Sequence, residues 1–276
     1  MFKIFMTVCN RLEVTKHAIK AIEKHSTIPY QLYIYDNHTN YRLDDHFDYY
    51  KQLFKTGKAT QITFNTRAST FNAFSKASAC NQFGLTHEID PQRDTYDFLL
   101  ILDNDIIVTP DYDKYLKNAW MDVKKHKITN VKIISQNPGG IVNKKPIAVK
   151  IANQGAVVGK AGGSGFWCVQ NNFFRDVGFL DLKLLVGLNK RHDINYWKRL
   201  DRASQGKPYI LGLNRKLCVH CGGISGSVCN ILTRNRNSKN VNDLIKFKTE
   251  DELIGKMSFE EFYTHVIKNV QCTNNW

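Results

Sequence analysis

Apolar and polar positions follow two different periods in turn along the first 135 residues. Short apolar runs predict strands, and segments with an apolar residue every three or four positions predict helices. The expected strands are Phe2–Cys9, Gln31–Tyr35, Gln61–Phe64, Tyr96–Leu102 and Val131–Ser135. The expected helices are Leu12–His25, Thr70–Leu85 and Tyr112–Lys124. This alternation predicts an α/β fold with a mostly parallel sheet and helices on both of its faces.

The pattern changes after Pro138-Gly139-Gly140. The later segments predict a small antiparallel part and further helices: a hairpin in Pro146–Gly159, a helix near Ile194–Ser204, strands near Tyr209–Leu211 and Leu217–Val219, and a helix in Met257–Val270. We therefore expect one α/β domain over residues 1–223, with halves 1–123 and 124–223. Residues 224–276 are expected to form a helical C-terminal appendage.

The triplet Asp103-Asn104-Asp105 directly follows the apolar strand Tyr96–Leu102. Carboxylates at positions i and i+2 of an extended chain leave the sheet on the same side. Such oxygen ligands suit Mg²⁺ or Mn²⁺, and these ions suit a diphosphate. Ligands of parallel sheets bind at the carboxyl ends of the strands. Asn10, Asp36 and Asp103 all fall at such ends, so we expect them to converge.

The net charge of +14 is carried by the second half of the chain. Residues 124–240 contain 21 Lys and Arg against four acidic residues, a net of +17, and the remainder carries −3. A lysine-rich solvated surface is one interpretation. A segment without any Glu also favours a polyanionic partner, either nucleic acid or an anionic membrane surface.

The seven cysteines are odd in number and scattered, which favours reduced thiols over a disulfide framework. Cys218, His220, Cys221 and Cys229 raise the alternative of a structural zinc site, but no second CxxC follows. No run of eighteen apolar residues predicts a membrane span, and the N-terminus turns polar too soon for a signal peptide. A cytoplasmic protein is expected.

At this point the chain resembles the family 2 glycosyltransferases, metal-dependent enzymes of the GT-A fold that use nucleotide-sugar donors. The resemblance covers roughly residues 2–223. It rests on seven segments in the family's order: FMTVCNR, IYDNHT, ASACNQFGL, LILDNDIIVTPDY, GGSGFWCVQNNFFRDVGFLD, HDINYWKRL and LCVHCGG. It implies a GT-A, Rossmann-like fold and a Mn²⁺ or Mg²⁺ cofactor.

The resemblance also implies roles for individual residues. Donor binding falls to Thr7, Asn10, Arg11, Asp36, Asn81, Asp103 and Asn104. Metal binding falls to Asp103, Asp105 and His220, and the catalytic base is Asp193. The acceptor pocket is lined by Gly163, Ser164, Phe166, Trp167 and Trp197. His192 stands where the family commonly has an acid, so Asp193 is the single carboxylate at that position.

Chemistry supports these roles, and each has a structural alternative. Asp36 can accept the imide N–H of uracil, which indicates a UDP-sugar, or it can close an Asx turn. His220 can ligate a metal ion or simply pair between strands. Asp193 can activate the acceptor hydroxyl, which predicts inversion at the anomeric carbon, or it can cap a helix.

Three other function classes compete with a glycosyltransferase. No GxGxxG follows a strand, which disfavours a dinucleotide-dependent oxidoreductase, and the first loop lacks the glycines of a nucleotidyltransferase. A non-enzymatic nucleic-acid-binding protein would leave the triplet unused. Small phage members of the family modify hydroxymethylated bases in DNA, and the basic half favours such a pyrimidine in DNA as acceptor. A cell-surface or lipid-linked saccharide is the alternative.

Overall fold

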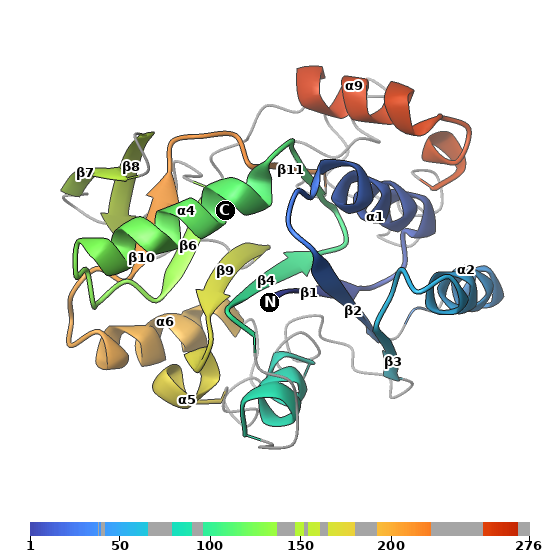
Figure 1. Cartoon of the computed structure of the whole chain (residues 1–276). Coiled ribbons are helices and arrows are strands. Elements are labelled where there is room, and N and C mark those ends of the chain that lie inside the picture. Colours follow the sequence, from blue (N-terminus) through green and yellow to red (C-terminus); the bar gives the residue numbers. More distant parts are fainter. Residues whose placement is uncertain are drawn as a thin grey trace, which may run out of the picture.

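The computed structural model describes residues 1–37, 39, 42–65, 79–89, 96–136, 147–151, 154–160, 165–179, 192–221 and 251–269. A nine-stranded sheet forms its centre, in the order β3-β2-β1-β4-β9-β6-β10-β8-β7 (Figure 1). The strands are β1 (Phe2–Val8), β2 (Tyr30–Asn37), β3 (Gln61–Asn65), β4 (Phe98–Asp103), β6 (Ile133–Gln136), β7 (Ile147–Ile151), β8 (Gln154–Gly159), β9 (Phe166–Gln170) and β10 (Ile210–Leu213).

The first four strands of this order are mutually parallel, and β10 is parallel to β6. Strand β9 runs antiparallel to both β4 and β6, and β8 runs antiparallel to β10 and β7. A separate antiparallel pair joins β5 (Ile106–Val108) to β11 (Cys218–His220). The predicted class, a mostly parallel α/β sheet with a small antiparallel part, is confirmed.

Helices cover both faces of the sheet and bury two hydrophobic cores. One core takes residues from α1 (Leu12–His25), α2 (Leu43–Lys55), α4 (Tyr112–Lys125) and α9 (Phe259–Asn269). The other takes residues from helical positions 79–84, α5 (Phe173–Val177) and α6 (His192–Ala203). Positions 79–84 continue directly into a π-helix, η1 (Leu85–Ile89). The predicted arrangement of helices on both faces is therefore present.

Strict alternation along the strands sorts the side chains between the two cores. In β1, Ile4 and Met6 belong to the first core and Phe5 to the second. In β9, Phe166 belongs to the first core and Trp167 to the second. Successive side chains of a strand point to opposite faces, so a central strand with apolar residues at every position is buried on both sides.

The C-terminal segment packs on the first core through Ile254, Phe262 and Val266, which are fully buried. In Figure 1 helix α9 lies beside α1, although the two are more than 230 residues apart in the sequence. The helical character predicted for Met257–Val270 is confirmed by α9. No helix in the described part of the chain is long and apolar enough to cross a membrane.

Most predicted elements are confirmed within one to three residues at each end. The helix predicted for Thr70–Leu85 is seen from residue 79, and its earlier part lies outside the described residues. Helix α2 and strands β5 and β9 were not predicted. In α2 the buried residues His46, Tyr50 and Leu53 are spaced by four and three positions, a helical signal diluted by the surrounding polar residues.

Gly84 is required for the packing of its helix against α5. A Cβ atom at this position would lie 2.5 Å from Cγ of the Phe174 ring, which is itself buried. We expect Gly84→Ala to reduce the free energy of unfolding by about 1–3 kcal/mol, the usual cost of overpacking. Denaturant unfolding measures this loss. Phe174→Leu in the same chain should recover part of it, and strictly additive losses would contradict the predicted clash.

Candidate active site

The triplet Asp103-Asn104-Asp105 lies where β4 ends at the carboxyl edge of the sheet. The Thr7 hydroxyl of neighbouring β1 donates to Asp103 Oδ1 over 2.9 Å. The backbone N–H of Asp103 donates to the carbonyl of Gly165, just before β9. Asp103 is thus fixed by both neighbours of its strand, and its backbone lies in the plane of the sheet.

Asp105 lies between Arg11 and His220. Its Oδ2 atom is 2.7 Å from Arg11 Nη1 and 3.3 Å from His220 Nε2. The Arg11 and Asp105 side chains are 7% and 13% exposed. His220 is brought here by the β5–β11 pair, in which it is opposite Ile106. The predicted convergence of Asp105 and His220 is therefore observed, and Arg11 joins them.

These contacts shift the pKa values of Asp105 and His220. Burial alone would raise the pKa of Asp105, but the charges and hydrogen bonds of His220 and Arg11 outweigh it and lower that pKa. Burial opposes protonation of His220, yet the negative charges of Asp105 and Asp103 raise the pKa of the imidazole. The site thus favours an ionised carboxylate, the form that a metal ion requires.

The donor set fits a divalent cation that is completed by its substrate. Asp105 Oδ1 is buried and accepts no hydrogen bond from the described residues. Arg11 and His220 both contact the other oxygen, Oδ2. No group of three His, Cys, Asp or Glu side chains in the described residues is arranged to hold an ion alone. Mg²⁺-type sites commonly combine one or two carboxylates with substrate phosphates and water. Asp105 would hold such an ion, with His220 beside it.

Among the described residues, Cys218, His220 and Cys221 are not arranged to hold a metal ion by themselves, and Cys229, the fourth residue of the zinc alternative, lies outside the described residues. Cys218 and Cys221 are buried, and none of the five cysteines in the described residues forms a disulfide. Their burial on the apolar first core agrees with the predicted reduced thiols.

Asn104, the central residue of the triplet, braces the loop between β1 and α1. Its Nδ2 donates to the carbonyl of Asn10 at 3.1 Å and to Thr15 Oγ1 at 2.9 Å. Its backbone N–H donates to the carbonyl of Thr7. The amide is thereby engaged inside the protein, so the structure gives Asn104 a bracing role. Its predicted contact with a donor stays a prediction.

The braced loop has a strained backbone. Asn10 and Arg11 have φ values of 54° and 61°, in the left-handed region that residues with a Cβ atom seldom adopt. Each costs about 1–2 kcal/mol in this conformation, and such residues cluster at functional sites. The conformation turns the chain sharply between β1 and α1 and aims Arg11 at Asp105.

The C-terminal segment caps the helix that follows this loop. Arg11, the N-cap residue of α1, makes no side-chain cap, and Asp251 supplies it instead. Asp251 accepts the backbone N–H groups of Leu12 and Glu13 at 3.2 and 3.1 Å. Arg42 lies 3.7 Å from the same carboxylate. Unpaired N–H groups at a helix N-terminus favour an acidic partner.

Asp36 forms the centre of a buried network at the end of β2. It accepts the backbone N–H and hydroxyl of Thr39 at 2.9 and 2.8 Å and the hydroxyl of Tyr50 at 3.1 Å. The Thr39 hydroxyl in turn accepts the N–H of Asn10. Asn10, Asp36 and the triplet are therefore linked, as predicted. Asp36 accepts the backbone N–H three residues on, whereas an Asx turn joins residues two apart, so the Asx turn and the contact with a base both stay predictions.

The predicted acceptor residues are placed differently. Phe166 and Trp167 are 2% and 1% exposed, in the first and second cores. Core packing accounts for both side chains, because β9 is covered on both faces, so the structure does not present them to an acceptor. Gly163 and Ser164 lie outside the described residues. For Trp197 only its position in α6 is described.

Two further predicted residues are located without a described contact to the triplet. Asp193 is the second residue of α6, and the structure describes its backbone position alone. Both roles weighed for it, catalytic base and helix cap, stay open. Asn81 lies half-buried on helical residues 79–84, on the face of the sheet opposite α1.

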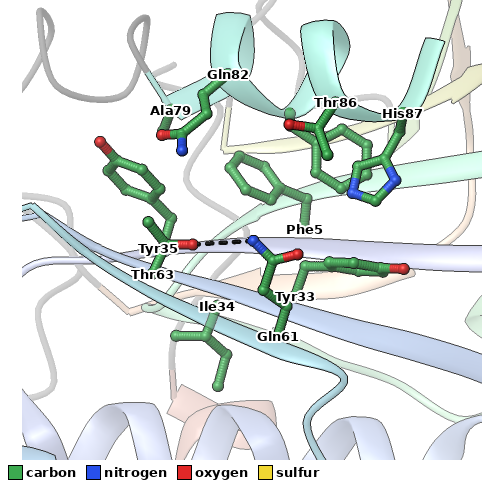
Figure 2. Close-up of a pocket in the computed structure, with 11 residues that line it drawn as sticks. Phe5, Tyr33, Ile34, Tyr35, Gln61, Thr63, Ala79, Gln82, Thr86 and His87 are labelled. Carbon is green, nitrogen blue, oxygen red and sulfur yellow. Dashed lines mark hydrogen bonds between the residues drawn. The ribbon is translucent and has the colours of Figure 1, made fainter. Parts of the chain in front are cut away.

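A small crevice separates that helix from the sheet. Figure 2 shows Gln82, Thr86 and His87 of the helical segment facing Tyr33, Tyr35 and Gln61 of the strands. Gln61 Nε2 donates to Thr63 Oγ1 at its floor. Its volume is about 20 Å³, room for about one water molecule. The crevice is too small for a nucleotide.

Solved structures share this fold. The protein matches S. aureus TarS with a TM-score of 0.51 and 12% identity, over 97% of this chain and 45% of that one. It matches GalNAc-T7 with UDP, GalNAc and Mn²⁺ with a TM-score of 0.55 and 12% identity, over 98% and 57%. The mannosyltransferase PcManGT from Pyrobaculum calidifontis, in complex with GDP-Man and Mn²⁺, gives 0.51 and 8%, over 99% and 76%.

The chain thus has the predicted GT-A fold of these glycosyltransferases, and it spans about half the length of TarS and GalNAc-T7. No protein-family model matches the sequence, and no curated protein matches it. At such low identities the likeness concerns the fold, and the chemistry has to be argued from the site.

The residues that hold the site in place were not predicted from the sequence. Asp251 carries no motif, and Thr39 ends the segment IYDNHT without an assigned role. Their roles depend on contacts over 239 and 29 residues of sequence. Arg11 was predicted to bind a donor, but its pairing with Asp105 was not foreseen. Two opposite charges that both follow strand ends were the available signal for that pair.

Asp251 makes stability depend on pH. Burial is the main cause that raises its pKa to about 6. The hydrogen bonds from the backbone N–H groups of Glu13 and Leu12 and the charge of Arg42 oppose the shift, and the Glu13 carboxylate adds to it. The folded protein then holds this proton more tightly than the unfolded chain does. We expect the melting temperature of the wild type to fall relative to Asp251→Asn, which cannot titrate, as pH rises from about 4 to 7. A wild type whose melting temperature rises relative to that of Asp251→Asn over this pH range would mean that the pKa of Asp251 is lowered.

Proposed function

We propose that this protein is a metal-dependent, inverting glycosyltransferase. It moves a sugar from a UDP-sugar donor to a hydroxyl acceptor. The observation that carries the proposal is the buried Asp105 between Arg11 and His220 at the carboxyl end of β4. The shared fold supports it, since GalNAc-T7 is seen with UDP and Mn²⁺ and PcManGT with GDP-Man and Mn²⁺.

The residues of the site have complementary tasks in this reaction. Asp105 and His220 would hold Mn²⁺ or Mg²⁺, which offsets the charge that builds on the leaving diphosphate. Asp103, fixed by Thr7, lies beside them and is proposed to contact both the cation and the donor. Arg11 supplies a permanent positive charge within reach of the same diphosphate. Fixed charges in a buried site stabilise the transition state without reorganisation.

Asp193 is proposed as the general base that takes the proton of the acceptor hydroxyl. An activated hydroxyl that attacks in line inverts the anomeric carbon. The position of Asp193 at the start of α6 is compatible with this role.

The acceptor is proposed from charge. The described part of the second half exposes basic side chains on α6, among them Lys198 and Arg202. A polyanion such as DNA with a hydroxymethylated pyrimidine fits this surface, and a surface or lipid-linked saccharide is the alternative. Neither acceptor is supported by the comparisons, so the assay below has to distinguish them.

Asp105→Ala tests the catalytic proposal. The variant should lose sugar release from UDP-sugars in the presence of Mn²⁺ by at least a factor of about 10², because the transition-state charge loses its cation. Asp97→Asn is the matched control. Asp97 comes just before the first residue of β4, at the end of the strand away from Asp105, and its side chain is 71% exposed. Full activity of Asp105→Ala in excess EDTA would rule out the metal site.

Salt dependence tests the acceptor. If the basic half contacts about six phosphates, affinity for duplex DNA should fall by about three decades between 50 and 200 mM salt. Reversal of Lys198 and Arg202 to Glu should weaken binding to every sequence alike. Reversal of the exposed Lys51 and Lys55 on α2 is the control and should change little.

The same preparation distinguishes the acceptors chemically. The enzyme is incubated with UDP-sugars and DNA that contains hydroxymethylated pyrimidines, and the digested nucleosides are weighed by mass spectrometry. Added hexose or pentose supports the DNA proposal. Absence of DNA binding at low salt, with transfer to a saccharide instead, would overturn the DNA acceptor and leave the transferase proposal intact.

A further inference from the structure

The carboxylate of Asp105 is the target of two kinds of cation. In the structure its Oδ2 atom is occupied by Arg11 at 2.7 Å and approached by His220 at 3.3 Å. The proposed divalent cation needs the same side chain. Opposite charges that are both mostly buried hold each other firmly, because either one alone would carry a large desolvation cost. Arg11 and a metal ion must therefore compete for the Asp105 carboxylate or share its two oxygens.

We propose that Arg11 is an exchangeable counter-ion: it neutralises Asp105 before a donor binds and moves to the diphosphate when a divalent cation takes the carboxylate. This inference rests on the proposed function, because the cation and the diphosphate are its ligands. It assigns Arg11 a role in the order of binding, beyond a contact with the donor.

The two oxygens of Asp105 allow such an exchange. Arg11 and His220 both address Oδ2, while Oδ1 is buried and accepts no hydrogen bond from the described residues. In the proposed exchange the cation takes Oδ1, which has no hydrogen-bond partner among the described residues to lose, while Arg11 still holds Oδ2. The carboxylate need not pass through a state in which it is buried without a positive partner, the costly state for such a group.

Hydrogen bonds hold the backbone of the loop around Arg11. The carbonyl of Arg11 accepts the N–H and hydroxyl of Thr15 at 3.0 and 2.9 Å. Asn104 and Thr39 hold the carbonyl and the N–H of Asn10, and Asp251 holds the next two N–H groups. With this backbone anchored, the proposed exchange is a rotation of the long side chain alone. A guanidinium also suits a diphosphate, which it can contact through two N–H groups.

Cooperative binding follows from this exchange. Without a diphosphate, Arg11 opposes the approach of a second cation to Asp105. With a diphosphate present, Arg11 has a new partner, and the cation gains phosphate ligands. Each ligand should therefore raise the affinity for the other, by the same factor.

The test measures Mn²⁺ binding by the electron paramagnetic resonance of the unbound ion, with and without UDP. In Arg11→Gln, Mn²⁺ alone should bind at least about fivefold more tightly than in the wild type, because the competing charge is gone. The gain in Mn²⁺ affinity on adding UDP should shrink by a similar factor. Arg11→Lys keeps the charge and should resemble the wild type without nucleotide.

Arg42→Gln is the matched control, since Arg42 contacts Glu13 and Asp251 near the same helix end and is not paired with Asp105. Its Mn²⁺ affinity should equal that of the wild type. Unchanged or weaker Mn²⁺ binding in folded Arg11→Gln, or an equal gain in Arg42→Gln, would overturn the inference. A wild type that binds Mn²⁺ but does not respond to UDP would contradict the proposed function, and the comparison without nucleotide would still decide whether Arg11 competes for Asp105.

Discussion

The ion pair between Arg11 and Asp105 organises this end of the molecule. It joins the β1–α1 loop to the turn after β4, and it brings a permanent positive charge to a buried carboxylate. His220 completes the group from a strand pair that lies outside the main sheet. Without these partners an ionised Asp105 could not be kept in so buried a position. The proposed chemistry depends on that ionised carboxylate, so the ion pair links stability of the site to its function.

The strain of the loop and the bonds that hold it belong to the same arrangement. Two left-handed residues in succession, Asn10 and Arg11, are unfavourable by themselves. They persist because neighbouring elements supply hydrogen bonds: Asn104 from the triplet, Thr39 from the loop after β2, and Asp251 from the C-terminal segment. The C-terminal segment is therefore part of the support of the candidate site as well as a cover for the first core.

The sequence predicted the frame well because the signals of that frame are local. Apolar runs such as that of β4 and the helical period of α1 determine their elements within a few residues, and strand ends identify Asp36, Asp103 and Asp105. Contacts between distant segments were not predictable in this way. The Asp251 cap, the position of Trp167 in a core and the bracing role of Asn104 depend on which elements become neighbours in space. The predictions for Gly163 and Ser164 fall outside the described residues.

The central claim is that Asp105 binds a divalent cation together with a nucleotide diphosphate. Crystals grown with Mn²⁺ and UDP, measured at the manganese absorption edge, test it most directly because anomalous scattering locates the ion independently of activity. The account predicts one manganese peak within coordination distance of Asp105 Oδ1 and of the diphosphate, with the Arg11 guanidinium turned from Oδ2 to a phosphate oxygen. A manganese peak elsewhere, or UDP bound with the Arg11–Asp105 pair intact and no metal beside it, would contradict the account.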